Sequence, residues 1–148
     1  MSTPKVEASD HCVRYQLDKG IHRFTFTESS SDAVDEYLHQ LAALYDRTSP
    51  GETLRILLDS SEVCVQPINY TSQSASKINA LYPNRPATRT ACMYRTRFMA
   101  SLGRTAMFTQ TRAGIDKVQF FCGDDCEAEA LVWLQVDEIS TKEKSYWQ

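Results

Sequence analysis

The stretch Leu54-Arg-Ile-Leu-Leu-Asp-Ser-Ser-Glu-Val63 decides the fold of this chain. Its first part, Leu54 to Leu58, is a mostly apolar run of strand length, and the polar residues Asp59-Ser60-Ser61 close it. A short apolar run with a polar end is typical of a strand that is buried on both faces of a sheet. The stretch therefore predicts the central strand of an α/β domain.

The residues before this strand predict a hairpin and a helix. Apolar and polar side chains alternate in Cys12–Leu17 and in Ile21–Thr27, and the turn-forming pair Lys19-Gly20 lies between them. Several N-cap candidates follow at 29–32, and apolar side chains then recur every three or four residues as far as Arg47. We expect an amphipathic helix that connects the hairpin to the central strand.

The residues after the central strand predict alternating helices and strands. In chain order these are a helix at 67–81, a strand at 88–94, a helix from 97 to before Gly114, a strand at 117–122 and a helix at 124–134. Asp124 and Glu127 have the spacing of a capping box for the last helix. The alternation predicts an α/β fold with a mixed, mostly parallel sheet and covering helices.

Length and composition predict one intracellular domain. The chain has 148 residues, of which 42% are hydrophobic, and this is enough for a single core. We expect residues 1–10 to be disordered, residues 11–136 to form the domain and residues 137–148 to form a charged tail. There is no signal peptide and no transmembrane run, and the five irregularly spaced cysteines suit reduced thiols. These features predict a cytoplasmic protein.

The charge of the chain is unevenly distributed. Residues 63–115 contain no Asp or Glu and carry +7, whereas residues 1–62 and 116–148 carry −5 each, for a net charge of −3. Arg97 and Arg104 are seven residues apart and so point to the same side of a helix. Arg89 and Arg95 lie on or next to the preceding strand, beside Tyr94. We expect this basic face to bind an anionic group, or to pair with the acidic ends of the same domain.

A second candidate site lies at the carboxyl edge of the sheet. Ser60 and Ser61 follow the central strand, where ligands bind in open α/β sheets; the other interpretation is a polar loop whose side chains form local bonds to the backbone. Cys126 is a candidate reactive thiol because it falls in the first turn of a helix. The chain lacks a nucleotide-binding motif, a nucleophile elbow and a set of residues with metal-ligand spacing, so no cofactor and no metal are expected.

The order of elements from Cys12 to Leu134 resembles the STAS-like superfamily. The residues that carry the resemblance are Leu54–Val63, Arg89-Thr-Ala-Cys-Met-Tyr94, Val118-Gln-Phe-Phe121 and Glu127-Ala-Glu-Ala-Leu-Val-Trp-Leu134. They are most similar to small stand-alone bacterial proteins related to anti-sigma-factor antagonists and CRAL-TRIO-type domains. The resemblance implies a four- or five-stranded sheet, opened by the hairpin, with about four helices mainly on one face.

The resemblance also implies a regulatory or ligand-binding role without catalysis. Anti-sigma-factor antagonists carry a phosphorylated serine at a helix start, and the corresponding residues here, Pro67-Ile68-Asn69, include no hydroxyl group. The sequence thus favours a non-enzymatic module that binds a protein, an anionic small molecule or a lipid headgroup. The alternatives are a small hydrolase-like or redox enzyme and a self-assembling protein such as a homodimer. Nucleic acid is disfavoured because the protein is acidic and has no nucleic-acid-binding motif.

Overall fold

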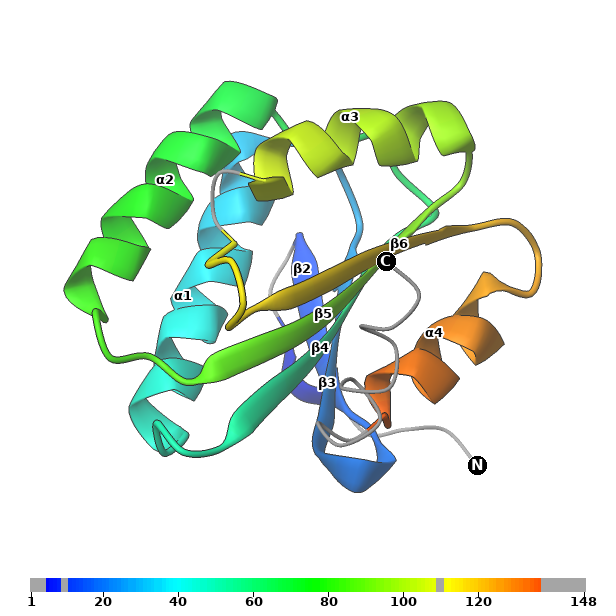
Figure 1. Ribbon diagram of the computed structural model, residues 1–148. Helices are drawn as coiled ribbons and strands as arrows, with labels where there is room; N and C mark the ends of the chain where they lie inside the picture. The colour runs from blue at the N-terminus through cyan, green and yellow to red at the C-terminus, as the bar shows by residue number, and fades with distance from the viewer. Residues whose placement is uncertain (1–4, 9–10, 109–110, 137–148) are drawn as a thin grey trace.

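A computed structural model describes residues 5–8, 11–108 and 111–136, which form six strands and four α-helices (Figure 1). The elements in chain order are β1 (Lys5–Ala8), β2 (Cys12–Gln16), β3 (Ile21–Phe26), α1 (Ser31–Arg47), β4 (Thr53–Ser60), α2 (Ile68–Leu81), β5 (Ala87–Tyr94), α3 (Arg97–Phe108), β6 (Lys117–Cys122) and α4 (Cys126–Leu134). None of these helices is long and apolar enough to cross a membrane.

The strands lie side by side in the order β1-β2-β3-β4-β5-β6, which is also their order along the chain. β1, β2 and β3 pair antiparallel, while β3 through β6 are parallel. The hairpin turn uses Lys19 and Gly20, whose positive φ angles of 63° and 73° suit the twist of paired strands. The α/β class, the mixed sheet and the opening hairpin are therefore confirmed.

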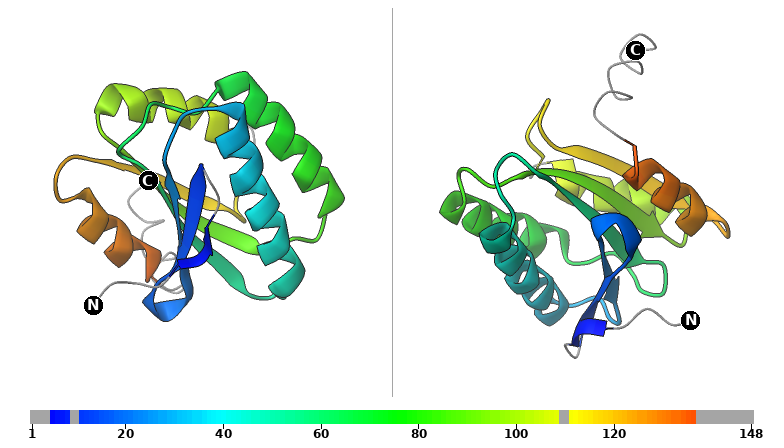
Figure 2. Two further views of the ribbon diagram at one scale, coloured as in Figure 1. Left: turned by 180° about the vertical axis from the view of Figure 1, so that it is seen from behind. Right: turned by 90° about the horizontal axis from the view of Figure 1, so that it is seen from below.

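Helices cover both faces of the sheet, three on one side and one on the other (Figure 2). The larger core lies under α1, α2 and α3 and includes Phe24, Ile56 and Cys92. The smaller core lies under α4, where Leu57, Ala91 and other sheet residues meet the helix. The expectation of helices mainly on one face is confirmed, and the fourth helix gives the opposite face a core of its own.

Helix α1 shows how local sequence produces its element. Ser30 is the N-cap, and its side-chain oxygen accepts a hydrogen bond of 3.1 Å from the backbone N–H of Ala33. The buried side chains recur at helical spacing, among them Val34, Leu38 and Leu41. This apolar face covers the larger core, as the sequence predicted.

Three local expectations are corrected. Residues 5–8 form the edge strand β1 instead of being disordered, because their backbone pairs with β2, so the sheet has six strands rather than four or five. The central strand continues through Asp59 and Ser60, both buried. The N-cap of α4 is Asp125 without a side-chain cap bond, and Glu127 pairs with Arg23 instead of closing a capping box. The expected charged tail, 137–148, lies outside the described residues.

Candidate functional site

The carboxyl edge of the sheet holds a network of charged and hydroxyl side chains. The backbone N–H and the hydroxyl of Ser61 both donate to Oδ1 of Asp59, at 3.0 and 2.6 Å. Arg23 donates to Oδ2 of Asp59 at 2.6 Å and also forms an ion pair with Glu127 at the start of α4. The hydroxyl of Ser61 is therefore engaged locally, and Ser60 is buried in β4.

This network holds Asp59 in its charged form. Burial alone would raise the pKa of Asp59, but the hydrogen bonds from Ser61 and the charge of Arg23 outweigh burial and lower the pKa below its usual value. A carboxylate that already accepts these hydrogen bonds is a poor general base. The arrangement suits a structural link between β3, β4 and α4.

The histidines give the enzyme alternative no support. His22 accepts a hydrogen bond of 3.2 Å from Arg14, and burial together with the charges of Arg14 and Arg47 lowers its pKa to about 4. His11 lies 3.2 Å from a carboxylate oxygen of Glu28. Within the described part of the chain, none of the three histidines hydrogen-bonds to a hydroxyl or thiol group that could serve as a nucleophile.

Cys126, the candidate reactive thiol, is the first residue of α4 and is buried against the sheet. Burial raises its pKa, and the negative charges of Asp59 and Glu127 raise it further. A thiol with a raised pKa is protonated and unreactive at neutral pH. The geometry therefore argues against a reactive thiol at this position.

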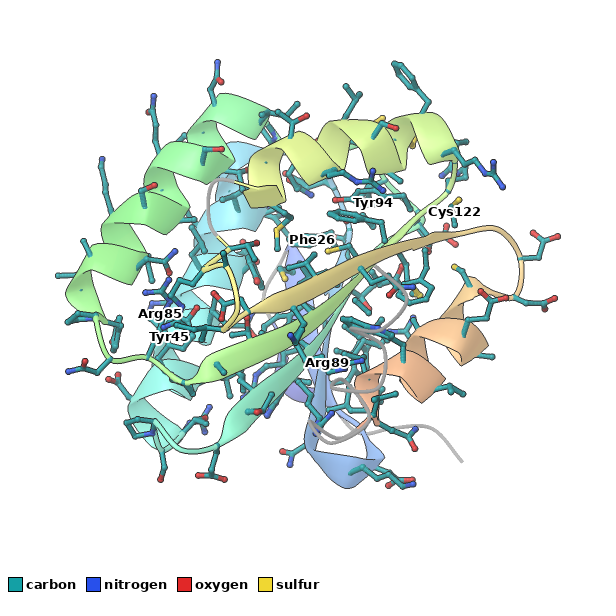
Figure 3. All side chains as sticks on the ribbon, in the orientation of Figure 1. Phe26, Tyr45, Arg85, Arg89, Tyr94 and Cys122 are labelled. Atoms are coloured by element: carbon teal, nitrogen blue, oxygen red, sulfur yellow. The ribbon has the colours of Figure 1, made fainter. Side chains whose placement is uncertain are left out.

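Arg89 serves the fold rather than the surface, since it is only 3% exposed. Its Nε donates to the backbone oxygen of Trp133 at 2.8 Å, and its guanidinium lies 3.9 Å from the centre of the Trp133 ring (Figure 3). Arg55, its neighbour in the sheet, donates to the backbone oxygens of Leu134 and Val136. The last carbonyls of a helix carry partial negative charge, so the two arginines cap the carboxyl end of α4.

Arg112 and Arg85 are also engaged within the protein, at the amino ends of the parallel strands. Arg112 forms an ion pair of 2.8 Å with Asp116 and donates to the backbone oxygens of Arg85 and Pro86. The guanidinium of Arg85 donates to the backbone oxygen of Tyr82 at 3.3 Å. These arginines hold the connections around β5 in place. Their guanidinium groups already bind groups of the protein instead of a ligand.

Tyr94 lies beneath α3 instead of lining a surface site (Figure 3). Its ring stacks on Phe120 at 6.3 Å between centroids, and burial raises the pKa of its hydroxyl. A Cβ atom on Gly103 would lie 2.1 Å from the Tyr94 hydroxyl oxygen. The glycine in α3 thus allows the helix to approach this ring closely.

The exposed arginines that the sequence singled out gather at α3. Thr96 caps the helix by accepting a hydrogen bond from the N–H of Met99, and Arg95 donates to the backbone oxygen of Ser61 at 3.2 Å. Arg97 and Arg104 are exposed. Within the described residues, no carboxylate forms an ion pair with any of these three arginines. Internal pairing therefore explains Arg112 but not this group.

Exposed apolar side chains accompany the arginines on α3. Phe98 is 72% exposed and Leu102 is 37% exposed. At about 100° per residue, Arg97 and Arg104 form one edge of the exposed side, and Phe98 and Leu102 form the other. We call these four residues the α3 surface. It combines positive charge with an exposed aromatic ring, and the sequence analysis identified only the charged half.

A small cavity borders Arg85 and Asp116 at the amino ends of the parallel strands. It lies between α1, α2 and the sheet, has a volume of about 40 Å³, and is lined by residues that include Tyr37, Ile56 and Arg85. Pockets for small ligands are typically about 300–1,000 Å³. A cavity of this size holds a few water molecules and is too small for a lipid chain.

Comparison with solved structures identifies the architecture. The chain aligns with the crystal structure of an uncharacterized protein of the DUF3478 family from Shewanella loihica PV-4, described as having a SpoIIAA-like fold. The alignment covers 87% of this chain and 98% of the other, with a TM-score of 0.58 and 15% sequence identity. The fold is SpoIIAA-like. No family model and no curated protein matches the sequence.

The SpoIIAA-like fold confirms the resemblance seen in the sequence, at the level of architecture. The sequence resemblance placed the phosphorylated serine of anti-sigma-factor antagonists at 67–69, which is the start of α2. Here Pro67 is the N-cap, and the first serine or threonine of the helix, Thr71, donates its hydroxyl to the backbone oxygen of Pro67 at 2.6 Å. The start of α2 gives no support for phosphorylation by that mechanism.

Proposed function

We propose that this protein is a non-enzymatic binding module whose α3 surface binds an acidic segment of a partner protein. The observation that carries the proposal is the exposure of Arg97 and Arg104 beside Phe98 and Leu102. Arginine and aromatic residues are enriched where protein interfaces have most of their binding energy. The carboxyl edge offers no comparable chemistry, because its polar groups are already paired.

The spacing of the arginines favours a protein segment over a single small anion. Seven residues of α-helix separate Arg97 from Arg104, which is about 10 Å along the helix axis. A single phosphate or carboxylate group would have to draw both long side chains together across this distance, at a cost in side-chain entropy. An acidic segment with two or more carboxylates, and an apolar side chain for Phe98, fits the surface better.

A photo-crosslinking amino acid at Ser101, which lies between the two edges of the α3 surface, tests the proposal in the protein's own cell extract. We expect one partner to be crosslinked through an acidic segment, and we expect Arg97→Glu/Arg104→Glu to abolish this crosslink. The control is Lys77→Glu, which reverses an exposed charge on α2. Equal crosslinking in the double variant would contradict the proposal, as would crosslinking to anionic phospholipid instead of protein.

A further inference from the structure

Helix α4 has an apolar side that faces away from the sheet. Cys126, Ala130 and Leu134 are buried against the sheet, as an amphipathic helix requires. On the outer side, however, Val132 is 69% exposed and Ala128 is also exposed. Glu127 and Glu129 in its first turn separate the buried side from this outer apolar side, so α4 has apolar residues on two sides, and the second side is uncovered within the described residues.

This outer side continues into an open groove between α4 and β6. The groove has a volume of about 510 Å³ and is lined mainly by apolar side chains, among them Phe121, Val132 and Trp133. The rings of Phe121 and Trp133 are 6.1 Å apart, and Arg89 stacks on Trp133 from within the protein. The floor of the groove is therefore held in one conformation.

The same groove borders an open edge of the sheet. β6 is the last strand in the sheet order, and no strand among the described residues pairs with its outer side (Figure 1). Its central residues, Val118–Phe121, contain no charge and no proline. Proteins normally protect an edge strand with charges, prolines or bulges, so an unprotected edge is suited to pairing with another strand.

The charges at the two ends of β6 are complementary under two-fold symmetry, while Glu129 of α4 also lines the groove. Lys117 lies at the start of β6, on the α4 side of the sheet, next to Arg89. Asp124 and Asp125 are exposed at the opposite end, in the turn after β6. If β6 pairs antiparallel with β6 of a second copy, Lys117 of each copy approaches the two aspartates of the other.

We propose that this groove and edge bind a second copy of the chain, with β6 antiparallel to β6 across a two-fold axis. The pairing joins the two sheets through their β6 edges, and the outer sides of the two α4 helices cover each other's grooves. The proposal rests on α4 and β6 and is independent of the α3 surface. It places the dimer contact in an apolar groove, unlike an assembly that joins the basic middle of one copy to the acidic ends of another.

Measurement of the molar mass in solution tests this proposal with matched variants. We expect the wild type to have twice the monomer mass of 16.8 kDa and Val132→Arg to have the monomer mass. Leu81→Arg is the control, since Leu81 is 73% exposed at the end of α2 and should leave the dimer intact. A monomeric wild type, as expected if residues 137–148 of the same chain fill the groove, would overturn the proposal. Equal dissociation by Leu81→Arg would also overturn it.

A charge exchange tests the antiparallel arrangement itself. Lys117→Glu should raise the dimer dissociation constant roughly tenfold, because it places a third negative charge beside Asp124 and Asp125. Adding Asp124→Lys and Asp125→Lys to that variant should restore the wild-type constant. Failure of the triple variant to recover, in a protein whose unfolding midpoint is unchanged, would contradict the two-fold pairing of β6.

Discussion

Two parts of the acid-free stretch 63–115 use the same residue type in opposite ways. At the α4 side of the sheet, Arg89 is buried, stacked on Trp133 and bonded to a helix carbonyl. At the α3 surface, Arg97 and Arg104 are exposed beside apolar groups, and the guanidinium of Arg104 lies 5.1 Å from the centre of the Phe120 ring. A basic stretch of sequence therefore need not form a basic surface. The place of each arginine in the fold decides whether its guanidinium is buried or is exposed for binding.

The largest effect on stability should come from the buried arginine, Arg89. Arg89→Met keeps the apolar stem but removes the charged hydrogen bond and the cation–π contact with Trp133. We expect the free energy of unfolding to fall by about 3 kcal/mol. Urea denaturation measures this loss. An unchanged midpoint would show that Arg89 is not needed to cap α4.

A smaller, pH-dependent effect on stability should come from Asp59, which is linked to Glu127 of α4 through Arg23. Its pKa is lowered in the folded state, so its stabilisation is present above the unfolded-state pKa of about 3.9 and is lost as the pH falls through the folded-state value. Asp59→Asn should therefore be less stable than the wild type at pH 7, by about 2 kcal/mol.

The difference between Asp59→Asn and the wild type should shrink in acid and vanish below the folded-state pKa. Denaturation midpoints measured between pH 7 and pH 2 follow this change. Ser61→Ala serves as a partial control, because it removes one hydrogen bond to Asp59 and leaves the ion pair with Arg23 in place. A constant difference at every pH would contradict the account of this network.

The contact between Gly103 and the Tyr94 ring should give an effect on stability of similar or smaller size. Gly103→Ala places a methyl group where the Tyr94 hydroxyl now lies, and the stacking of Tyr94 on Phe120 restricts its movement. We expect a loss of about 1–2 kcal/mol in unfolding free energy, as for other overpacked cores. The ring carbons Cζ and Cε2 of Tyr94 would also lie 2.4 and 2.9 Å from the added methyl group, so the double variant Gly103→Ala/Tyr94→Phe, which removes only the oxygen, should recover only a small part of the loss.

Much of the fold could be predicted from the sequence, because periodicity and turn residues report local structure directly. The hairpin, helix α1 and the strand after Leu54 were all predicted close to their observed bounds. Strand β1 was missed although Lys5-Val6-Glu7-Ala8 alternates polar and apolar residues. Its pairing with β2 is a backbone contact between segments, which a composition-based prediction of disorder does not consider.

The candidate site was harder to predict than the fold, because burial depends on tertiary packing. Arg89 and Arg97 look alike in sequence, yet only the structure places α4 over the first and leaves the second exposed. The apolar residues Phe98, Met99 and Leu102 have the spacing of a buried helix face, but Phe98 is 72% exposed. Its exposure adds an apolar half to a surface that charge alone had indicated.

The smallest expected effect on stability belongs to the α3 surface. Arg97→Glu/Arg104→Glu should lower the free energy of unfolding by about 1 kcal/mol or less, because both side chains are exposed and neither forms an ion pair within the described residues, while the guanidinium of Arg104 lies 5.1 Å from the centre of the Phe120 ring. The same variant should lose the crosslinked partner. At the α3 surface the double variant would then lose binding while it largely keeps its stability, whereas Arg89→Met should lower the free energy of unfolding.

Titration of the crosslinked partner into the wild type and into Arg97→Glu/Arg104→Glu, by calorimetry at two salt concentrations, tests the central claim most directly. The account predicts saturable binding by the wild type that weakens as salt rises, and at least roughly a hundredfold weaker binding by the folded double variant. Equal affinity of the two proteins would contradict the claim that the exposed arginines of α3 form the binding surface.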